Sequence, residues 1–150
     1  MTNTEYKKQV VEACLAVLRE TAANAKREMD DAQKQANDYG QPKDRYDSFR
    51  TKLMRMRDLF AKQYALANEN IKRMEELDYT KLSEKVEYGS IVITDKQQLF
   101  VALGLGKIPV SNTVFYAISL NVPVYEVMKG CKKGDSFTFN GIRQEIKDVF

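Results

Sequence analysis

Apolar and small residues recur along residues 5–77 in the alternating steps of four and three that are typical of a coiled-coil seam. The seam positions of the first arm are Val11, Leu15, Leu18, Ala22, Ala25, Met29, Ala32, Ala36 and Tyr39. Those of the second arm are Phe49, Leu53, Met56, Phe60, Tyr64, Ala67, Ile71 and Met74, with one stutter across Phe60. This pattern predicts two long helices that pack through their apolar stripes.

The helical pattern is interrupted once, over residues 38–44, which contain Gly40 and Pro42. No other Gly or Pro occurs before Gly89. Gly ends helices at low cost and Pro starts them, so the pair indicates a sharp reversal rather than a continuous rod. We therefore expect an antiparallel hairpin with arms of roughly 34 residues, about 50 Å long.

Acidic residues gather at this reversal, namely Asp38, Asp44 and Asp47. A hairpin of this length leaves most of its surface in water. We therefore expect its functional residues at the end of the hairpin, where it can reach into another molecule. Two interpretations are open. Asp44 caps the second helix through its N-terminal amides while Asp38 lies beside the turn, or the carboxylates act on another molecule.

The second arm begins with basic residues, and Asp58 is the first acid after Arg50, Lys52, Arg55 and Arg57. Arg50 and Arg57 are seven residues apart, whereas Lys52 projects elsewhere, so the four do not share one face. They form either a solvated surface or a basic flank. In the second interpretation, Arg50, Arg55 and Arg57 lie near a nucleic-acid backbone while the acids act beside it.

The composition changes in the C-terminal half, where six of the seven glycines and two of the three prolines lie from Gly89 onward. Residues 79–87 have no periodicity and indicate a linker between a hairpin over 1–78, with its tip at about 38–47, and a domain over 88–150. Asn140-Gly141 is a strong signal for a hairpin turn. We expect strands at 90–94, 99–103, 114–118, 136–139 and 142–149, and a short helix at 122–129. The predicted fold class is α+β: a helical hairpin followed by a small antiparallel β domain of about five strands with one helix.

The overall composition excludes several function classes. The formal charge of +3 is too small to indicate nucleic-acid binding by itself. No His is present, which excludes a self-contained Ser-His, Cys-His or zinc-histidine site. Cys14 and Cys131 form neither a zinc cluster nor a disulfide framework, and we expect two free thiols in a reducing cytoplasm. From the polar start we expect no signal peptide, and no apolar run approaches the roughly 20 residues that span a bilayer.

Three segments resemble the bacterial Gre family of transcription elongation factors. Residues 88–92 (YGSIV) match an aromatic-Gly-[AS]-x-V strand. Residues 119–135 (SLNVPVYEVMKGCKKGD) are similar to an S-x-x-S-P-[IL] helix followed by L-G-K-K-x-G-D. At the reversal, the family pattern G-D-L-x-E-N-A-E-Y corresponds to residues 40–48 (GQPKDRYDS). There Asp44 and Asp47 stand for the two Glu residues and Gln41 for the first Asp.

The resemblance implies an FKBP-like C-terminal domain and a hairpin that enters the secondary channel of RNA polymerase. Its tip would promote cleavage of backtracked RNA at the polymerase site, where Asp44 and Asp47 help to hold a shared Mg²⁺. Gln41 would offer only a neutral oxygen. The protein would bind no cofactor alone and would not be an enzyme by itself. The rim of the largest polymerase subunit would contact Asn121, Val122 and Pro123.

Two other interpretations remain. The replacement of an acid by Gln41 favours a secondary-channel regulator without cleavage activity. A coiled-coil interaction protein unrelated to transcription would instead carry an exposed apolar stripe outside the seam. Candidates for that stripe are Val10, Cys14, Val17, Leu59 and Leu66. Of these, Val10, Cys14 and Val17 lie near the open end, where packing against the β domain is the simpler expectation.

Overall fold

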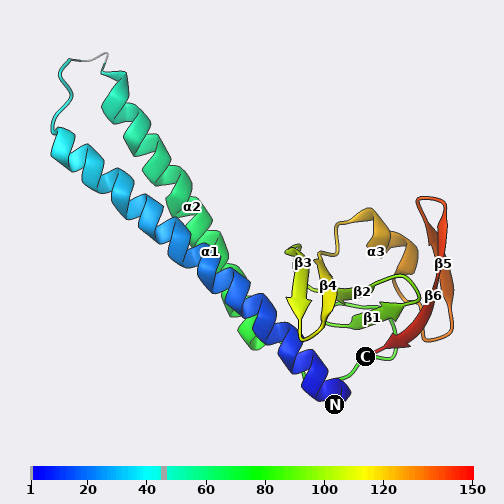
Figure 1. The fold of residues 1–150 in the computed structure, drawn as a ribbon. Helices are drawn as coiled ribbons and strands as arrows, with labels where there is room; N and C mark the ends of the chain where they lie inside the picture. The colour runs from blue at the N-terminus through cyan, green and yellow to red at the C-terminus, as the bar shows by residue number, and fades with distance from the viewer. Residues whose placement is uncertain (1, 45–46) are drawn as a thin grey trace. The chain divides into compact units, whose positions relative to one another are not determined.

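The computed structural model describes residues 2–44 and 47–150 (Figure 1). Their contacts define two compact units. One is the hairpin unit, Leu15–Glu75, and the other, the β unit, combines Glu76–Phe150 with the residues before Leu15. The sequence-based division assigns all of residues 1–78 to the hairpin, whereas the structure places the first turns of the first helix with the β domain.

The hairpin unit consists of most of α1 (Asn3–Tyr39) and α2 (Ser48–Glu76), which run antiparallel, side by side (Figure 1). On α1 the seam positions Leu15, Leu18, Ala22, Ala25, Ala32 and Ala36 are buried. On α2 the buried residues are Leu53, Ala67 and Met74. The predicted seam and the predicted reversal are therefore confirmed over most of their length.

Two predicted seam residues are nevertheless exposed. Phe49 has 53% of its surface accessible and Met56 has 39%. Both lie in the half of the hairpin near the reversal, where α1 supplies Ala32 and Ala36 at the seam. Alanine side chains are too small to cover a phenylalanine or a methionine, and the hairpin unit contains no third helix to cover them from outside.

The β unit contains six strands, and the sheet order is β3-β4-β2-β1-β6-β5. The strand bounds are β1 Ile91–Thr94, β2 Gln98–Val101, β3 Gly106–Val110, β4 Thr113–Ile118, β5 Ser136–Phe139 and β6 Ile142–Val149. All neighbours pair antiparallel except β2 and β4, which are parallel. Phe139 pairs with Ile142, so Asn140 and Gly141 form the predicted two-residue turn.

The fold class predicted from the sequence is confirmed, but the expected five strands are six. The missed strand is β3, which begins at Gly106, two residues after Gly104, and contains Pro109. Proline cannot donate a ladder hydrogen bond, so it argues against a central strand and is tolerated at a sheet edge. β3 is an edge strand, which reconciles its sequence with its structure.

One face of the sheet packs against α3 (Pro123–Met128) and forms an apolar core. Its buried residues are Val86, Val92, Leu99, Val101, Met128, Phe137, Ile146 and Val149. Val86 belongs to the predicted linker, and its backbone exchanges hydrogen bonds with the segment after α3. Its N–H donates to the oxygen of Cys131 (2.8 Å), and its oxygen accepts from the N–H of Gly130 (2.9 Å).

The first turns of α1 belong to this unit through specific contacts. The Tyr6 and Phe150 rings meet edge to face at 6.1 Å, and the Tyr6 hydroxyl donates to Gln98. Lys7 is 1% exposed, and its Nζ donates to the Lys81 oxygen at 3.0 Å. Burial lowers the pKa of Lys7, although Glu87 and Asp78 oppose the shift. This buried ammonium group joins α1 to the segment after α2 within the β unit.

Val10 and Cys14 are fully buried within the same unit, as expected for residues that pack at the open end. Burial raises the pKa of the Cys14 thiol to about 12. Cys131 is half-buried, and its pKa is raised by burial and by Asp135. No helix among the described residues combines the length and the apolar character needed to cross a bilayer.

The two leucines Leu53 and Leu59 provide a matched test of the seam, because they lie in the same helix with 5% and 54% of their surfaces exposed. We expect Leu53→Ala to lower the free energy of unfolding by about 2–4 kcal/mol through loss of burial and the cavity that remains. Leu59→Ala should change it by no more than about 0.5 kcal/mol. Urea unfolding followed by circular dichroism measures both, and equal losses would contradict the assigned seam.

The two cysteines should differ in reactivity. The thiolate is the reactive form, and Cys14 combines full burial with a strongly raised pKa. We expect a maleimide to label Cys131 in the native protein and Cys14 only after unfolding. Peptide mapping by mass spectrometry measures this, and equal native labelling at both positions would show that the β unit does not bury Cys14.

Candidate functional site at the hairpin tip

The first helix ends at Tyr39, directly before Gly40, as the sequence predicts. The N–H of Gly40 donates to the Ala36 oxygen at 3.1 Å, and the φ angle of Gly40 is +85°. This left-handed conformation is accessible to glycine without the steric cost that a Cβ atom brings. Gly40 therefore lets the chain leave the α1 axis immediately after the last turn.

The second helix is capped by Asp47. Its Oδ1 accepts a hydrogen bond from the N–H of Phe49 (3.2 Å), and its backbone oxygen accepts one from the Thr51 hydroxyl (3.2 Å). An Asp directly before a helix satisfies amides that would otherwise lack partners. The interpretation that Asp44 caps this helix is wrong, because α2 begins at Ser48, four residues later.

The second carboxylate oxygen of Asp47 closes the loop. Its Oδ2 accepts hydrogen bonds from the Tyr39 hydroxyl (2.8 Å) and from the N–H of Lys43 (2.9 Å). The Tyr39 ring contacts the Phe49 ring, with 5.0 Å between centroids, and the Lys43 ammonium lies 5.1 Å from the Tyr39 centroid. We call Tyr39, Lys43, Asp47 and Phe49 the tip cluster. It joins the end of α1, the loop and the start of α2.

These contacts set the electrostatics of the tip. The hydrogen bond from the Lys43 N–H and that from the Tyr39 hydroxyl hold the pKa of Asp47 below its usual value. The hydrogen bond that the Tyr39 hydroxyl donates to the Asp47 carboxylate raises the pKa of Tyr39. Both oxygens of Asp47 accept protein hydrogen bonds. Asp47 would therefore become a metal ligand only if the cap of α2 were weakened.

Asp44 and Gln41 differ from Asp47 because their side chains are exposed. The backbone oxygen of Asp44 accepts a hydrogen bond from the N–H of Asp47 at 3.2 Å, which connects the loop to the cap. In residues 2–44 and 47–150, no three His, Cys, Asp or Glu residues lie close enough together to hold a metal ion.

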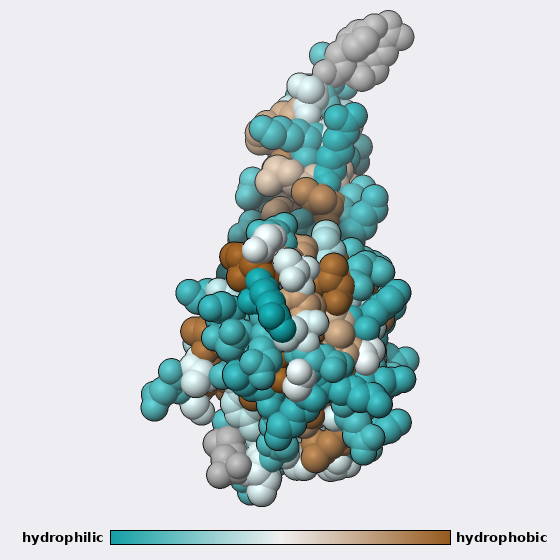
Figure 2. All heavy atoms as spheres, turned by 90° about the vertical axis from the view of Figure 1, so that its right-hand side faces the viewer, coloured by the Kyte–Doolittle hydropathy of each residue, from teal (hydrophilic) through white to brown (hydrophobic). Residues whose placement is uncertain are grey.

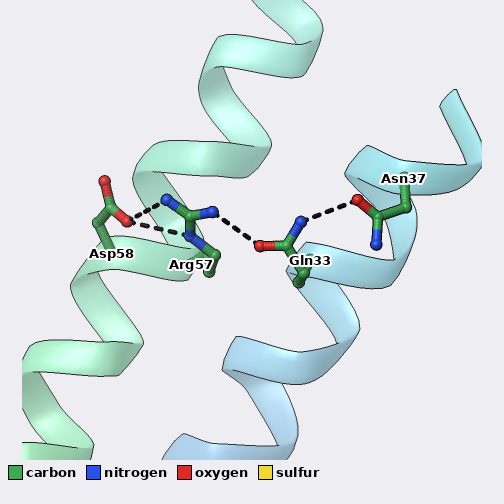
Figure 3. Close-up of polar contacts among 4 residues, drawn as sticks. All are labelled: Gln33, Asn37, Arg57 and Asp58. Atoms are coloured by element: carbon green, nitrogen blue, oxygen red, sulfur yellow. Dashed lines mark hydrogen bonds and ion pairs between the residues drawn. The ribbon is translucent and has the colours of Figure 1, made fainter. Parts of the chain in front are cut away.

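The predicted basic flank contains one arginine that bridges the helices. Arg57 donates from Nη1 to the Gln33 Oε1 (2.7 Å) and from Nε and Nη2 to the Asp58 Oδ1 (3.0 and 2.7 Å) (Figure 3). Gln33 in turn donates to Asn37 at 2.9 Å (Figure 3). The sequence analysis did not identify Gln33 as the partner of Arg57. Heptad spacing shows which residues lie beside the seam of one helix, but not which residue of the other helix each of them contacts.

The other two arginines occupy different surroundings. Arg50 is half-buried, and its Nε has no hydrogen-bond partner in the part of the chain that the structure describes. Arg55 is exposed. At about 100° per residue, Arg55 projects from a different side of α2 than Arg50 and Arg57 do. The three arginines therefore form no common patch, and their proximity to nucleic acid stays a prediction.

The predicted docking residues lie at the start of α3. Val122 precedes the helix with φ −86° and ψ 148°, without a side-chain cap, and Pro123 occupies the first turn. This extended conformation is the one that a following proline favours. Asn121 and Pro123 are exposed and Val122 is half-buried. Leu120 and Val127 are also exposed, so this surface carries apolar groups beside the amide of Asn121.

No known protein family and no curated protein matches this sequence. Two solved structures are similar in fold. One is described as the transcription factor Gfh1, with 16% identity, a TM-score of 0.35 and coverage of 91% of this chain and 93% of the other. The second is GreA factor homolog 1 (Gfh1) of Thermus thermophilus, with 13% identity, a TM-score of 0.34 and coverage of 91% and 94%.

The tip cluster makes a specific prediction about pH. A carboxylate whose pKa is lowered on folding stabilises the structure above its unfolded pKa, and this stabilisation is lost as the pH falls through the folded pKa. We expect the amide resonances of Lys43 and Phe49 to titrate together in acid, with a midpoint below 3.8, the usual value for Asp. NMR spectra recorded over the acid range measure this midpoint.

Tyr39→Phe is the matched control, since it keeps an aromatic ring against Phe49 and removes only the hydroxyl donor. In this variant the midpoint should move upward, toward the ordinary value. A midpoint that the loss of the hydroxyl leaves unchanged would show that Tyr39 does not hold Asp47 in solution.

Proposed function

We propose that this protein is a secondary-channel factor of RNA polymerase, similar in action to the Gre factors. The observation that carries the proposal is a two-helix hairpin whose far end exposes Asp44, followed by a β domain with the motif at residues 119–135. A two-helix hairpin is narrow, so it suits a channel. The β unit supplies a separate surface for attachment to the polymerase.

Asp44 is the residue that we assign to the reaction. Its exposed side chain lies in the loop at the tip, and its backbone is connected to the cap of α2 through the Asp47 N–H. Mg²⁺ in the polymerase site would activate water for hydrolysis of the RNA, and a carboxylate oxygen is the type of ligand that it prefers. Asp44 would add one such oxygen to a shell that the polymerase provides. The bond cleavage itself belongs to the polymerase.

Asp47 receives a different role in this proposal. Because it caps α2 and accepts the Tyr39 and Lys43 hydrogen bonds, it positions the loop that presents Asp44. The sequence resemblance offered Asp47 as a second metal-assisting residue. We assign the metal-assisting role to Asp44 because its side chain is exposed at the tip, with Gln41 as a neutral exposed neighbour.

A second candidate function follows from the same observation. A tip with one assigned carboxylate beside an amide offers fewer anionic ligands than the family pattern, which has three acids. This favours a regulator that occupies the channel without promoting cleavage. Both candidates share the attachment surface at Asn121, Val122 and Pro123.

Transcript cleavage in halted, backtracked elongation complexes tests the proposal. We expect the protein to shorten the RNA and Asp44→Ala to slow this at least about tenfold, the cost typical of losing even an outer partner of a catalytic metal. Binding to core polymerase, measured by fluorescence anisotropy, should stay unchanged in this variant. Asp31→Ala, which removes an exposed acid on α1 outside the tip, is the matched control and should retain full activity.

Each alternative result has a defined meaning. Full cleavage by Asp44→Ala would exclude this residue as the ligand. Polymerase binding without any RNA shortening would select the regulator. Absence of polymerase binding at low salt would reject both candidates.

A further inference from the structure

Two leucines of α2 are exposed outside the seam. Leu59 and Leu66 have 54% and 58% of their surfaces accessible, and each directly precedes a seam residue, Phe60 or Ala67. Seven residues separate them, which is two helical turns, so both project from the same side of α2. Hydrophobic side chains, shown in brown, reach the surface of the hairpin among hydrophilic ones in Figure 2.

Basic residues follow the same side of the helix. Lys52 is seven residues before Leu59, Arg55 is four before Leu59, and Lys62 is four before Leu66, spacings that place them on neighbouring positions. All three are exposed. We call Lys52, Arg55, Leu59, Lys62 and Leu66 the leucine flank.

The charges of this flank have no counterpart on the described chain. None of Lys52, Arg55 and Lys62 forms an ion pair within the residues that the structure describes. Asp58 is the one acid between residues 48 and 68, and it bonds to Arg57. Further along, Arg73 pairs with Glu69 at 3.3 Å, so the cationic surface ends there.

This combination of groups selects one kind of partner. Leucines at heptad spacing fit the apolar stripe of another helix, and flanking Lys and Arg pair with Glu or Asp on it. A nucleic-acid backbone would use the cations but would leave both leucines in water. A second copy in symmetric contact would place the same cations against each other, which costs free energy.

We propose that the leucine flank is a docking surface for an acidic amphipathic helix of a partner protein. The flank extends over the 15 residues from Lys52 to Leu66 of α2, a length of about 21 Å and two heptads. The surface is distinct from the tip cluster and from the residues at the start of α3. This proposal does not depend on binding to RNA polymerase. It gives a structural basis to the hypothesis of a coiled-coil interaction protein with an exposed apolar stripe.

Two synthetic helical peptides of three heptads test the proposal on the full chain. Both have leucine stripes, one flanked by Glu and the other by Lys, and each carries a fluorescent label for anisotropy measurements. We expect the acidic peptide to bind and the basic peptide not to bind. Leu59→Ser with Leu66→Ser should weaken binding about tenfold or more, because central apolar contacts dominate such interfaces.

A charge-reversal variant makes the test selective. Lys52→Glu with Arg55→Glu and Lys62→Glu should lose the acidic peptide and gain the basic one. Leu82→Ser removes an exposed leucine of the β unit and is the matched control, with no expected effect. Because all substituted positions are exposed, circular dichroism should show unchanged helicity in every variant.

Four outcomes would overturn the proposal. The first is failure of the acidic peptide to bind the wild-type chain, and the second is equal binding by the double serine variant. The third is tighter binding of a single-stranded RNA oligonucleotide that is insensitive to both leucines, which would assign the flank to nucleic acid. The fourth is a dimer in sedimentation equilibrium that the double serine variant abolishes, which would assign it to a second copy.

Discussion

The hairpin tip depends on the carboxylate of Asp47, which is shared between two tasks. One oxygen satisfies an amide at the start of α2, and the other holds the Tyr39 hydroxyl and the Lys43 amide. Both helices contribute to the cluster around this carboxylate, because Tyr39 of α1 packs against Phe49 of α2. Each partner donates to the ionised form, which explains why the pKa of Asp47 is lowered. A compact tip follows from local hydrogen bonds, without a third helix.

Some charged residues of the hairpin bind other parts of the hairpin, whereas others have exposed side chains. Asp47 closes the tip, and Arg57 joins α2 to Gln33 of α1. Asp44, Arg55, Lys52 and Lys62 have exposed side chains. Exposed side chains such as these are accessible to another molecule. A run of charges in the sequence can therefore suggest more binding residues than are accessible. Arg57 belongs to the basic run, but it forms hydrogen bonds to its own chain.

The β unit obtains its core from three parts of the chain. The sheet and α3 bury Met128, Phe137 and Ile146 together with Val86 of the linker. Val10 and Cys14, at the start of α1, are buried in the same unit. The buried ammonium of Lys7 accompanies this packing, with its Nζ bonded to the Lys81 oxygen. The first turns of α1 are therefore part of the fold of the β unit, although they are continuous with the hairpin helix.

The sequence by itself determined the two helices, their reversal at Gly40, the Asn140-Gly141 turn and most strands. These features depend on periodicity and on backbone preferences of adjacent residues, which a sequence displays directly. The tertiary structure alone decided that Asp47 rather than Asp44 caps α2, that Gln33 receives Arg57, and that Pro109 lies in an edge strand. It also showed that Phe49 and Met56 remain exposed despite their seam spacing. Each of these results depends on which residues of other segments lie close in space. The spacing of residues along the sequence does not give those distances, so a local pattern could not identify the partner or the exposed side chain.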